Sequence, residues 1–197
     1  DILEENDLQG LPQSAIDLAL KTAEDASLPG WRFSLQAPSY IPFMMFCENR
    51  TLRETMYEAY VTRASDTGPD AGQFDNGFLM VQILALRAEM ASLLGFADYA
   101  QYALEDRMAD SAQEVSEFLQ TLAGRAKEAA TEELDTLRRF ALTEHGEQNL
   151  EAWDIAFYSE KLKQSLYAFS DEEIRPYFPL PRVLEGLFFV TEKLFGV

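Results

Sequence analysis

The feature that most limits the fold of this chain is a long interval without proline. The eight prolines lie at positions 12, 29, 38, 42, 69, 176, 179 and 181, so none occurs between Asp70 and Arg175. This interval is rich in Ala, Leu, Glu and Gln, which favour helices, and it lacks the residue that breaks helices most strongly. It therefore predicts consecutive helices and a mainly α fold.

Capping signals indicate where these helices begin and end. A Ser or Thr followed three residues later by Glu, the capping-box pattern, occurs at 51–54, 111–114 and 170–173. Gly95 and Gly146 stand at expected helix ends, because glycine readily adopts the left-handed conformation of a C-cap. With the apolar periodicity, these signals predict helices at 12–26, 51–64, 75–94, 97–107, 112–144, 152–169, 171–177 and 181–195.

One short segment departs from the helical pattern. Residues 31–35 alternate apolar and polar side chains between Pro29-Gly30 and Pro38, which is typical of a strand. A single strand needs a partner, and no other segment offers an obvious one. We expect at most a short strand or two near residues 31–35.

Other features indicate a piece of a longer protein. We expect a single helical fragment over residues 1–197, with a sub-boundary, if there is one, near residues 66–74. The first residue is Asp rather than Met, and the last fifteen residues include nine strongly apolar ones that cover more than one helical face. A helix with that pattern is normally buried on several sides. The unpartnered strand and this terminal helix both predict a truncated chain.

Charge and cysteine content restrict the partners and the compartment. The 16 Lys and Arg residues against 34 Asp and Glu residues give a net charge of −18 with the histidine neutral. No nucleic acid or membrane partner is expected, because both present anionic surfaces to a binding protein. The single cysteine, Cys47, cannot form an intrachain disulfide, which favours the reducing cytoplasm.

Titratable side chains offer no catalytic or metal site within this sequence. The single histidine, His145, lies outside any His-Glu-x-x-His pair and is expected to be a solvated residue at a helix C-terminus. Cys47 lies among apolar residues and is expected in the core. Paired acidic residues such as 132–133 are expected on solvated helix faces. We predict no catalytic residue and no metal ligand here.

The segment 153–161 is the most unusual part of the chain. On a helix, Asp154 and Tyr158 share a face, and Lys161 follows three positions later. Apolar residues take two further faces: Ile155, Leu162, Leu166 and Phe169 on one, Trp153 and Phe157 on the other. Such a helix contains candidates for either a buried structural network or the wall of a ligand-binding channel: Trp153, Asp154, Phe157 and Tyr158.

Short motifs spread along almost the whole chain occur together in one known order. They are Leu35-x-x-Pro38-Ser39-Tyr40, Asn49-Arg50-x-Leu52-Arg53, Ala59-Tyr60-x-x-Arg63-Ala64-Ser65, Leu93-Leu94-Gly95-Phe96, Trp153-Asp154-x-x-Phe157-Tyr158-x-Glu160-Lys161, Pro176-Tyr177-Phe178-Pro179-Leu180 and Val183-Leu184-x-Gly186-Leu187-Phe188. In this order the sequence resembles the thimet-type zinc oligopeptidases, peptidase family M3.

The resemblance implies an intracellular, almost wholly helical, zincin-like metallopeptidase whose deep channel admits short peptides. In that family a His-Glu-x-x-His helix and a further Glu hold the zinc, which polarises the scissile carbonyl and a water. These residues are absent here, and the family places them beyond the region of Pro176–Leu180 and beyond Val197. The chain is therefore expected to be an inactive segment that binds no zinc itself, taken from a parent that uses zinc to hydrolyse peptides.

The expected partners are the parent's short peptide substrates and the missing catalytic portion of its own chain. An alternative from another class stays open, namely a free-standing acidic helical protein-interaction module without catalysis. In that case the apolar C-terminal helix would be the docking surface. A reading frame that continues past Val197 into His-Glu-x-x-His would favour the peptidase.

Overall fold

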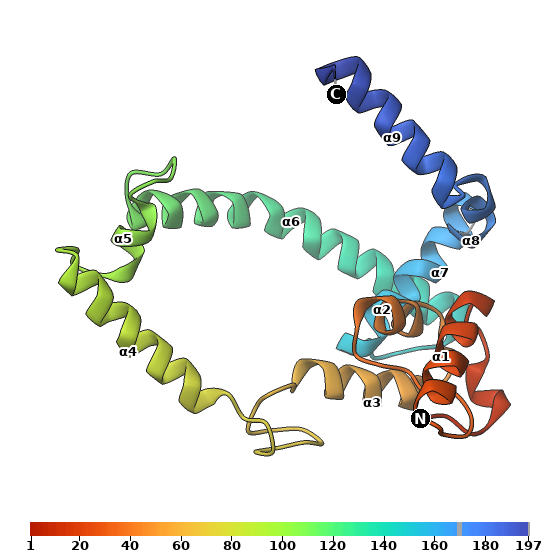
Figure 1. Ribbon diagram of the computed structural model, residues 1–197. Helices are drawn as coiled ribbons and strands as arrows, with labels where there is room; N and C mark the ends of the chain where they lie inside the picture. Colours follow the sequence, from red (N-terminus) through yellow and green to blue (C-terminus); the bar gives the residue numbers. More distant parts are fainter. Residues whose placement is uncertain (169–170, 197) are drawn as a thin grey trace.

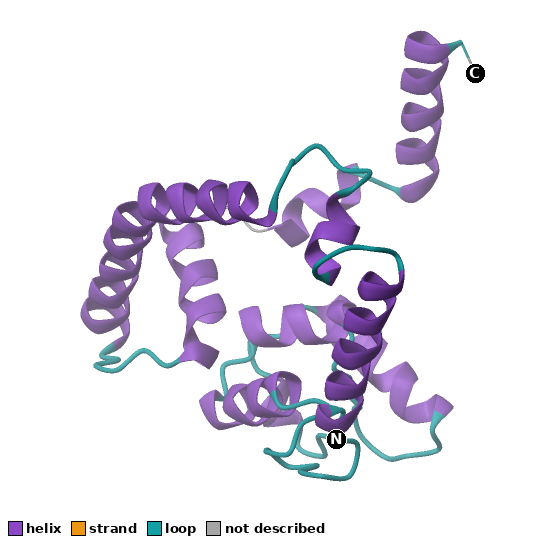
Figure 2. Cartoon of the chain, turned by 90° about the vertical axis from the view of Figure 1, so that its left-hand side faces the viewer, coloured by secondary structure: helices purple, strands orange, loops and turns teal. Residues whose placement is uncertain are grey.

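A computed structural model describes residues 1–168 and 171–196 as helices joined by loops (Figures 1 and 2). The α-helices are α1 (Gln13–Asp25), α2 (Ala37–Phe46), α3 (Arg50–Val61), α4 (Gly77–Leu93), α5 (Tyr99–Leu104), α6 (Ala112–His145), α7 (Ile155–Tyr167), α8 (Asp171–Ile174) and α9 (Leu180–Phe195). Short 3-10 helices occur at η1 (Glu5–Leu8), η2 (Ala152–Asp154) and η3 (Arg175–Tyr177). The predicted mainly α fold is confirmed.

Helix α2 was not among the helices predicted from the sequence, and it contains two prolines. Pro38 lies in the first turn, where the missing N–H would have no helical acceptor in any case. Pro42 lies inside the helix and costs one backbone hydrogen bond there. Phe43 and Met44 of the same helix are buried in the core, so tertiary packing offsets that cost.

The strand predicted at residues 31–35 is wrong. Only Trp31 pairs, through an isolated antiparallel bridge: its N–H donates to the Ile2 carbonyl at 2.9 Å, and its carbonyl accepts from the Ile2 N–H at 2.8 Å. The next N–H group, on Arg32, donates instead to the Ala19 carbonyl at 3.0 Å. The segment is therefore a loop that lies against α1. Its alternating apolar and polar side chains do not belong to a sheet.

The capping predictions are confirmed for α6 and wrong for α3. Ser111 Oγ accepts a hydrogen bond from the Glu114 N–H at 3.1 Å, and Gly146 closes the same helix with a φ of +71°. Helix α3 begins one residue before Thr51, because the Asn49 side chain accepts from the Leu52 N–H and supplies the cap. Phe169 and the box that begins at Ser170 lie outside the described residues.

A compact core forms where the N-terminal segment meets the region around α7, from α1, α2, α3, η2, α7 and the C-terminal end of α6 (Figure 1). Its first buried cluster comprises Ile2, Leu8, Leu11, Phe43, Met44 and Cys47. Its second joins α6 to α7 and comprises Leu137, Ala141, Phe157 and Tyr158. These two clusters hold the candidate site between them.

Gly10 allows the N-terminal segment to lie against the end of α2. Its φ is +87°, and a Cβ there would overlap the Phe46 carbonyl oxygen and approach Glu48 Cγ to 2.8 Å. The residue therefore needs both the left-handed conformation and the missing side chain, which only glycine combines.

Beyond α3 the chain leaves the core and forms an open arch of α4, α5 and the long helix α6 (Figure 1). Only the C-terminal part of α6 returns to the core, where Leu137 and Ala141 are buried. Helix α9 also projects away from the core and contains no buried residue. The fold thus has one packed region and two elements that extend from it.

Candidate functional site

Asp154 is the carboxylate at the centre of the candidate site, and it is 0% exposed. Its Oδ1 accepts a hydrogen bond from Arg53 Nη2 at 2.8 Å, and its Oδ2 accepts one from Arg50 Nη2 at 2.6 Å. The Glu151 N–H donates to the same Oδ2 at 3.1 Å and caps η2. We call Arg50, Arg53 and Asp154 the Arg–Asp cluster.

The hydrogen bonds of the Arg–Asp cluster keep Asp154 and Arg50 ionised. Burial by itself would raise the pKa of the Asp154 carboxyl, yet the hydrogen bonds from Arg50 and Arg53 outweigh burial and lower that pKa below its ordinary value. The hydrogen bond to Asp154 in turn raises the pKa of Arg50. Asp154 is therefore an anion at neutral pH whose oxygens are occupied, and it has no proton to give as a general acid.

Arg53 is 1% exposed and connects three parts of the core. Its Nη1 donates to the carbonyls of Cys47 at 2.7 Å and Glu48 at 3.2 Å, and its guanidinium lies 3.9 Å from the centre of the Phe157 ring. Its Nε has no partner within residues 1–168 and 171–196. The side chain therefore ties the end of α2 to α7 through Asp154 and Phe157.

The cluster joins segments that are far apart in sequence. Asp154 is 101 positions from Arg53 and 104 from Arg50. Arg50 also donates to the Asn149 carbonyl at 3.0 Å and lies 3.5 Å from the Glu147 carboxylate. The start of α3, after which the chain leaves the core, is thus fastened to the segment by which it returns.

The other three candidate residues differ in exposure. Phe157 and Tyr158 are buried, at 4% and 7% exposure, with ring centres 5.2 Å apart. Burial, together with the nearby charges of Glu147 and Asp154, raises the pKa of the Tyr158 phenol, which is therefore neutral. Trp153 is half-buried beside Tyr57, and its indole N–H has no partner in the part of the chain that the structure describes. Only Trp153 presents appreciable surface.

Lys161 lies apart from Asp154. Its Nζ donates to Glu48 at 2.9 Å and stands 4.7 Å from the centre of the Phe157 ring. The structure therefore divides the polar residues of this helix between two neighbours: Asp154 points to α3, and Lys161 points to the loop after α2.

Cys47 and His145 lie where the sequence predicts. Cys47 is 0% exposed, and burial raises the pKa of its thiol to about 11, so it is not a nucleophile at neutral pH. His145 is the exposed last residue of α6, with its ring 5.3 Å from Phe140 and 5.5 Å from Tyr158. Neither residue joins a constellation suited to nucleophilic catalysis.

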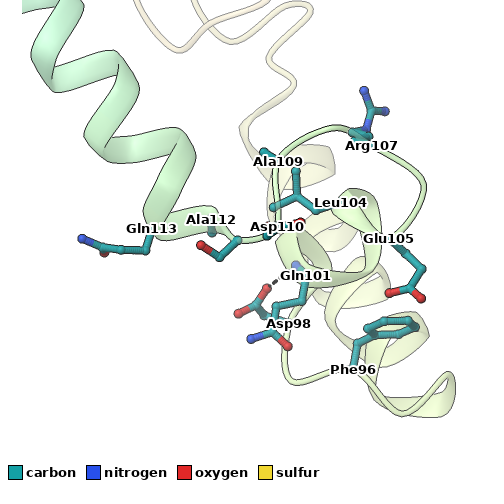
Figure 3. A pocket seen from close by; sticks show the side chains of 11 residues that line it. Phe96, Asp98, Gln101, Leu104, Glu105, Arg107, Ala109, Asp110, Ala112 and Gln113 are labelled. Atoms are coloured by element: carbon teal, nitrogen blue, oxygen red, sulfur yellow. Dashed lines mark hydrogen bonds between the residues drawn. The ribbon is translucent and has the colours of Figure 1, made fainter.

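A hollow of about 510 Å³ lies between α5 and the start of α6 (Figure 3). Two of its polar groups serve as helix caps, since Asp98 accepts from the Gln101 N–H and Ser111 from the Glu114 N–H. Arg107 Nε donates to the Ala103 carbonyl at 2.7 Å, and Gln113 Nε2 donates to the Glu117 carboxylate at 2.7 Å. Its polar side chains are therefore engaged in local structure and do not converge on a ligand.

A zinc ion would find no site among the side chains that the structure describes, which leave out those of residues 169–172, 175 and 197. No three His, Cys, Asp or Glu side chains gather there at a spacing that could hold a metal ion. A hydrolytic zinc needs three protein ligands and an open position, so the donor set does not fit. In the same residues no helix is long and apolar enough to cross a membrane.

The sequence did not single out Arg50 and Arg53 as partners of Asp154. Both belong to the motif Asn49-Arg50-x-Leu52-Arg53, which carried only a resemblance. Their spacing of three residues puts them on one helix face, a signal that could have indicated a shared anionic partner.

Comparison with known proteins places the sequence in a family. The profile of peptidase family M3 matches residues 43–197. Oligopeptidase A of Haemophilus influenzae is 51% identical over 193 residues, which cover 98% of this chain and 28% of that protein. Oligopeptidase A of Escherichia coli is 49% identical over 196 residues, 100% of this chain and 29% of that protein.

A more distant relative, named probable cytosolic oligopeptidase A, comes from Arabidopsis thaliana. It is 37% identical over 205 residues, which cover 100% of this chain and 28% of that protein. The chain thus spans less than a third of the length of the relatives it matches. Since the family profile covers most of the sequence, the chain belongs to peptidase family M3.

Proposed function

We propose that this chain is a helical segment of a zinc metallo-oligopeptidase that hydrolyses short peptides in the full-length parent. The observation that carries the proposal is the alignment of 98–100% of the chain, at about half identity, with under a third of proteins named oligopeptidase A. The zinc ligands and the general base come from polypeptide outside residues 1–197. The parent acts in the cytoplasm, which suits a buried, unpaired cysteine.

Within the parent this segment supplies scaffold rather than chemistry. Asp154, Phe157 and Tyr158 are buried, and Asp154 cannot contact a peptide without losing its arginine partners. We assign these three residues a structural role. Trp153 is the one candidate with surface to spare for a channel wall.

The alternative of a free-standing interaction module has less support. A module without catalysis would not be expected to align along its whole length with enzymes at 49–51% identity. The chain therefore retains the sequence of an oligopeptidase even where it holds no catalytic residue.

A chimera tests the proposal. Residues 1–197 of this chain replace the 196 aligned residues of E. coli oligopeptidase A, and hydrolysis of short peptides is measured with and without a chelator. We expect a chelator-sensitive peptidase, and no activity from the 197-residue chain alone. Chelator-sensitive hydrolysis by the chain alone would contradict the proposal, as would an inactive chimera that unfolds as cooperatively as the E. coli enzyme.

Two substitutions in the chimera distinguish a residue that stabilises the core from a residue that lines the peptide channel. Phe157→Leu should lower Tm and leave KM unchanged, because the ring packs on Arg53 inside the core. Trp153→Phe is the matched control at the partly exposed position. A raised KM with an unchanged Tm in Phe157→Leu would instead show that this residue contacts the peptide.

A further inference from the structure

Helix α4 exposes apolar side chains around its whole circumference. The consecutive residues Phe78, Leu79, Met80 and Val81 are 70%, 49%, 59% and 66% exposed. Four consecutive residues complete one turn of an α-helix, so no side of this turn is polar. A helix that is apolar all round is normally buried on all sides.

Within the described residues α4 has cover at one end only. Ala91 is fully buried, Arg87 lies 4.9 Å from the centre of the Tyr99 ring, and the helix contacts α5. The rest of the helix spans the open side of the arch (Figure 1). An uncovered apolar helix of this length is rare on a soluble monomer.

The charge on α4 also sets it apart from the rest of the molecule. The chain carries a net charge of −18, yet α4 contains a single Arg and a single Glu and is neutral overall. The surface that covers it therefore needs to be apolar and needs no compensating charge. An apolar, uncharged covering surface is typical of a protein interior, whereas a solvated or charged ligand does not provide one.

We propose that α4 is a docking element, covered on opposite sides by polypeptide of the same oligopeptidase that lies outside residues 1–197. This inference rests on the proposed function, because the relatives are more than three times longer than the region aligned here. Their additional polypeptide is long enough to cover a 17-residue helix from two sides.

A second copy of this chain fits α4 less well. A two-fold contact between two α4 helices covers one side of each and leaves the other exposed. Two chains of charge −18 also repel each other, whereas a segment of the same polypeptide is held nearby at high effective concentration. Covering by the same polypeptide is therefore the arrangement that both geometry and charge favour.

An introduced thiol tests the proposal. Leu84, which is 65% exposed, is replaced by cysteine in the 197-residue chain and in the chimera with E. coli oligopeptidase A. Its reaction rate with a thiol reagent is divided by the rate of the same protein in denaturant. The native Cys47 is fully buried and serves as the internal unreactive thiol, and Gln120→Cys on exposed α6 is the matched control in the isolated chain.

We expect Leu84→Cys to react in the isolated chain as fast as Gln120→Cys, and about 100-fold or more slowly in the chimera, the protection given by a stably packed site. A cysteine at the aligned position of the E. coli enzyme itself provides the same readout where the chimera fails to fold. A reactive thiol in the folded full-length protein overturns the proposal. Protection in the isolated chain that rises with concentration, together with a doubled mass by light scattering, also overturns it and assigns the face to a second copy.

The two proposals fail in different ways. An active chimera with a reactive thiol at position 84 removes the docking role and leaves the peptidase segment intact. A protected thiol in a folded but inactive chimera removes the proposed function and leaves the docking role.

Discussion

The Arg–Asp cluster and helix α4 each depart from the usual placement of residues, in opposite directions. The cluster takes two of its three charged side chains almost wholly out of solvent, whereas α4 leaves bulky apolar side chains in it. The Asp154 carboxylate is satisfied within the described part of the chain, because both of its oxygens accept hydrogen bonds there. Helix α4 leaves most of its apolar side chains uncovered among the same residues. The difference separates a part of the fold whose central carboxylate is paired within the chain from a part that, on our proposal, packs against further polypeptide.

The arch depends on the cluster in a simple way. Residues 54–153 lie between Arg53 and Asp154, so the ion pairs of the cluster close the long chain segment that contains the arch. Few contacts within the arch offset the entropy lost when the ends of that segment are brought together. The comparison therefore predicts large effects for substitutions in the cluster and small ones for substitutions on α4.

Asp154→Ala should have the largest effect. It leaves the guanidinium of Arg53 buried without a counter-charge, which costs about 3–5 kcal/mol. That loss is a large fraction of the roughly 5–15 kcal/mol by which a typical domain is stable. Urea unfolding followed by circular dichroism measures it. The matched control is Asp135→Ala, which breaks an exposed pair with Arg138 and should cost less than about 0.5 kcal/mol. Equal midpoints for the two variants would show that the cluster does not stabilise the core.

A pair of leucines on one helix gives the next largest difference. Leu137 of α6 is 6% exposed and packs against α7, whereas Leu142 is 50% exposed. Leu137→Ala should cost about 2–4 kcal/mol through lost contacts and a residual cavity. Leu142→Ala should cost about 0.5 kcal/mol or less. The difference between their urea midpoints measures how firmly the returning end of the arch is held, and similar midpoints would mean that α6 is not anchored there.

The helices outside the proline-containing segments could be predicted from the sequence, because periodicity and caps are local properties. Ser111 and Gly146 mark both ends of α6 without any tertiary information. Helix α2 could not be predicted, since Pro42 opposes it locally and the burial of Phe43 and Met44, which favours it, is a tertiary property. The strand at residues 31–35 failed for the same kind of reason, because the Arg32 N–H donates to a helix carbonyl rather than to a strand.

The candidate site, too, could be predicted only in part from the sequence. That Asp154 belongs to an unusual helix start is visible in the sequence, but its partners lie more than 100 positions away. No periodicity or cap reports a contact at that separation. The resemblance identified the family, while the structure supplied the role of Asp154 as an ion-pair centre.

Low pH should lower the unfolding free energy by protonating Asp154. The loss should be smaller than that caused by Asp154→Ala. The folded pKa of this carboxyl lies below its ordinary value, so its contribution is complete above about pH 4, the unfolded pKa, and is lost as pH falls through the folded pKa. Asp154→Asn lacks this contribution and should show a shallower fall in unfolding free energy below pH 4 than the parent chain. Urea titrations at a series of pH values, with an osmolyte to keep the variant folded, measure both slopes. Parallel curves would show that Asp154 is not the group that titrates.

The smallest effect is expected on α4. Val81 is 66% exposed and contributes little to the isolated chain, so Val81→Gln should change its unfolding free energy by less than about 0.5 kcal/mol. The same substitution in the chimera with E. coli oligopeptidase A should cost at least about 1–3 kcal/mol, because it would bury an amide without a partner. Urea unfolding of the two proteins gives both numbers. Equal small effects in the two proteins would show that α4 stays in solvent in the full-length enzyme. The cluster and α4 would then differ only in how exposed their side chains are.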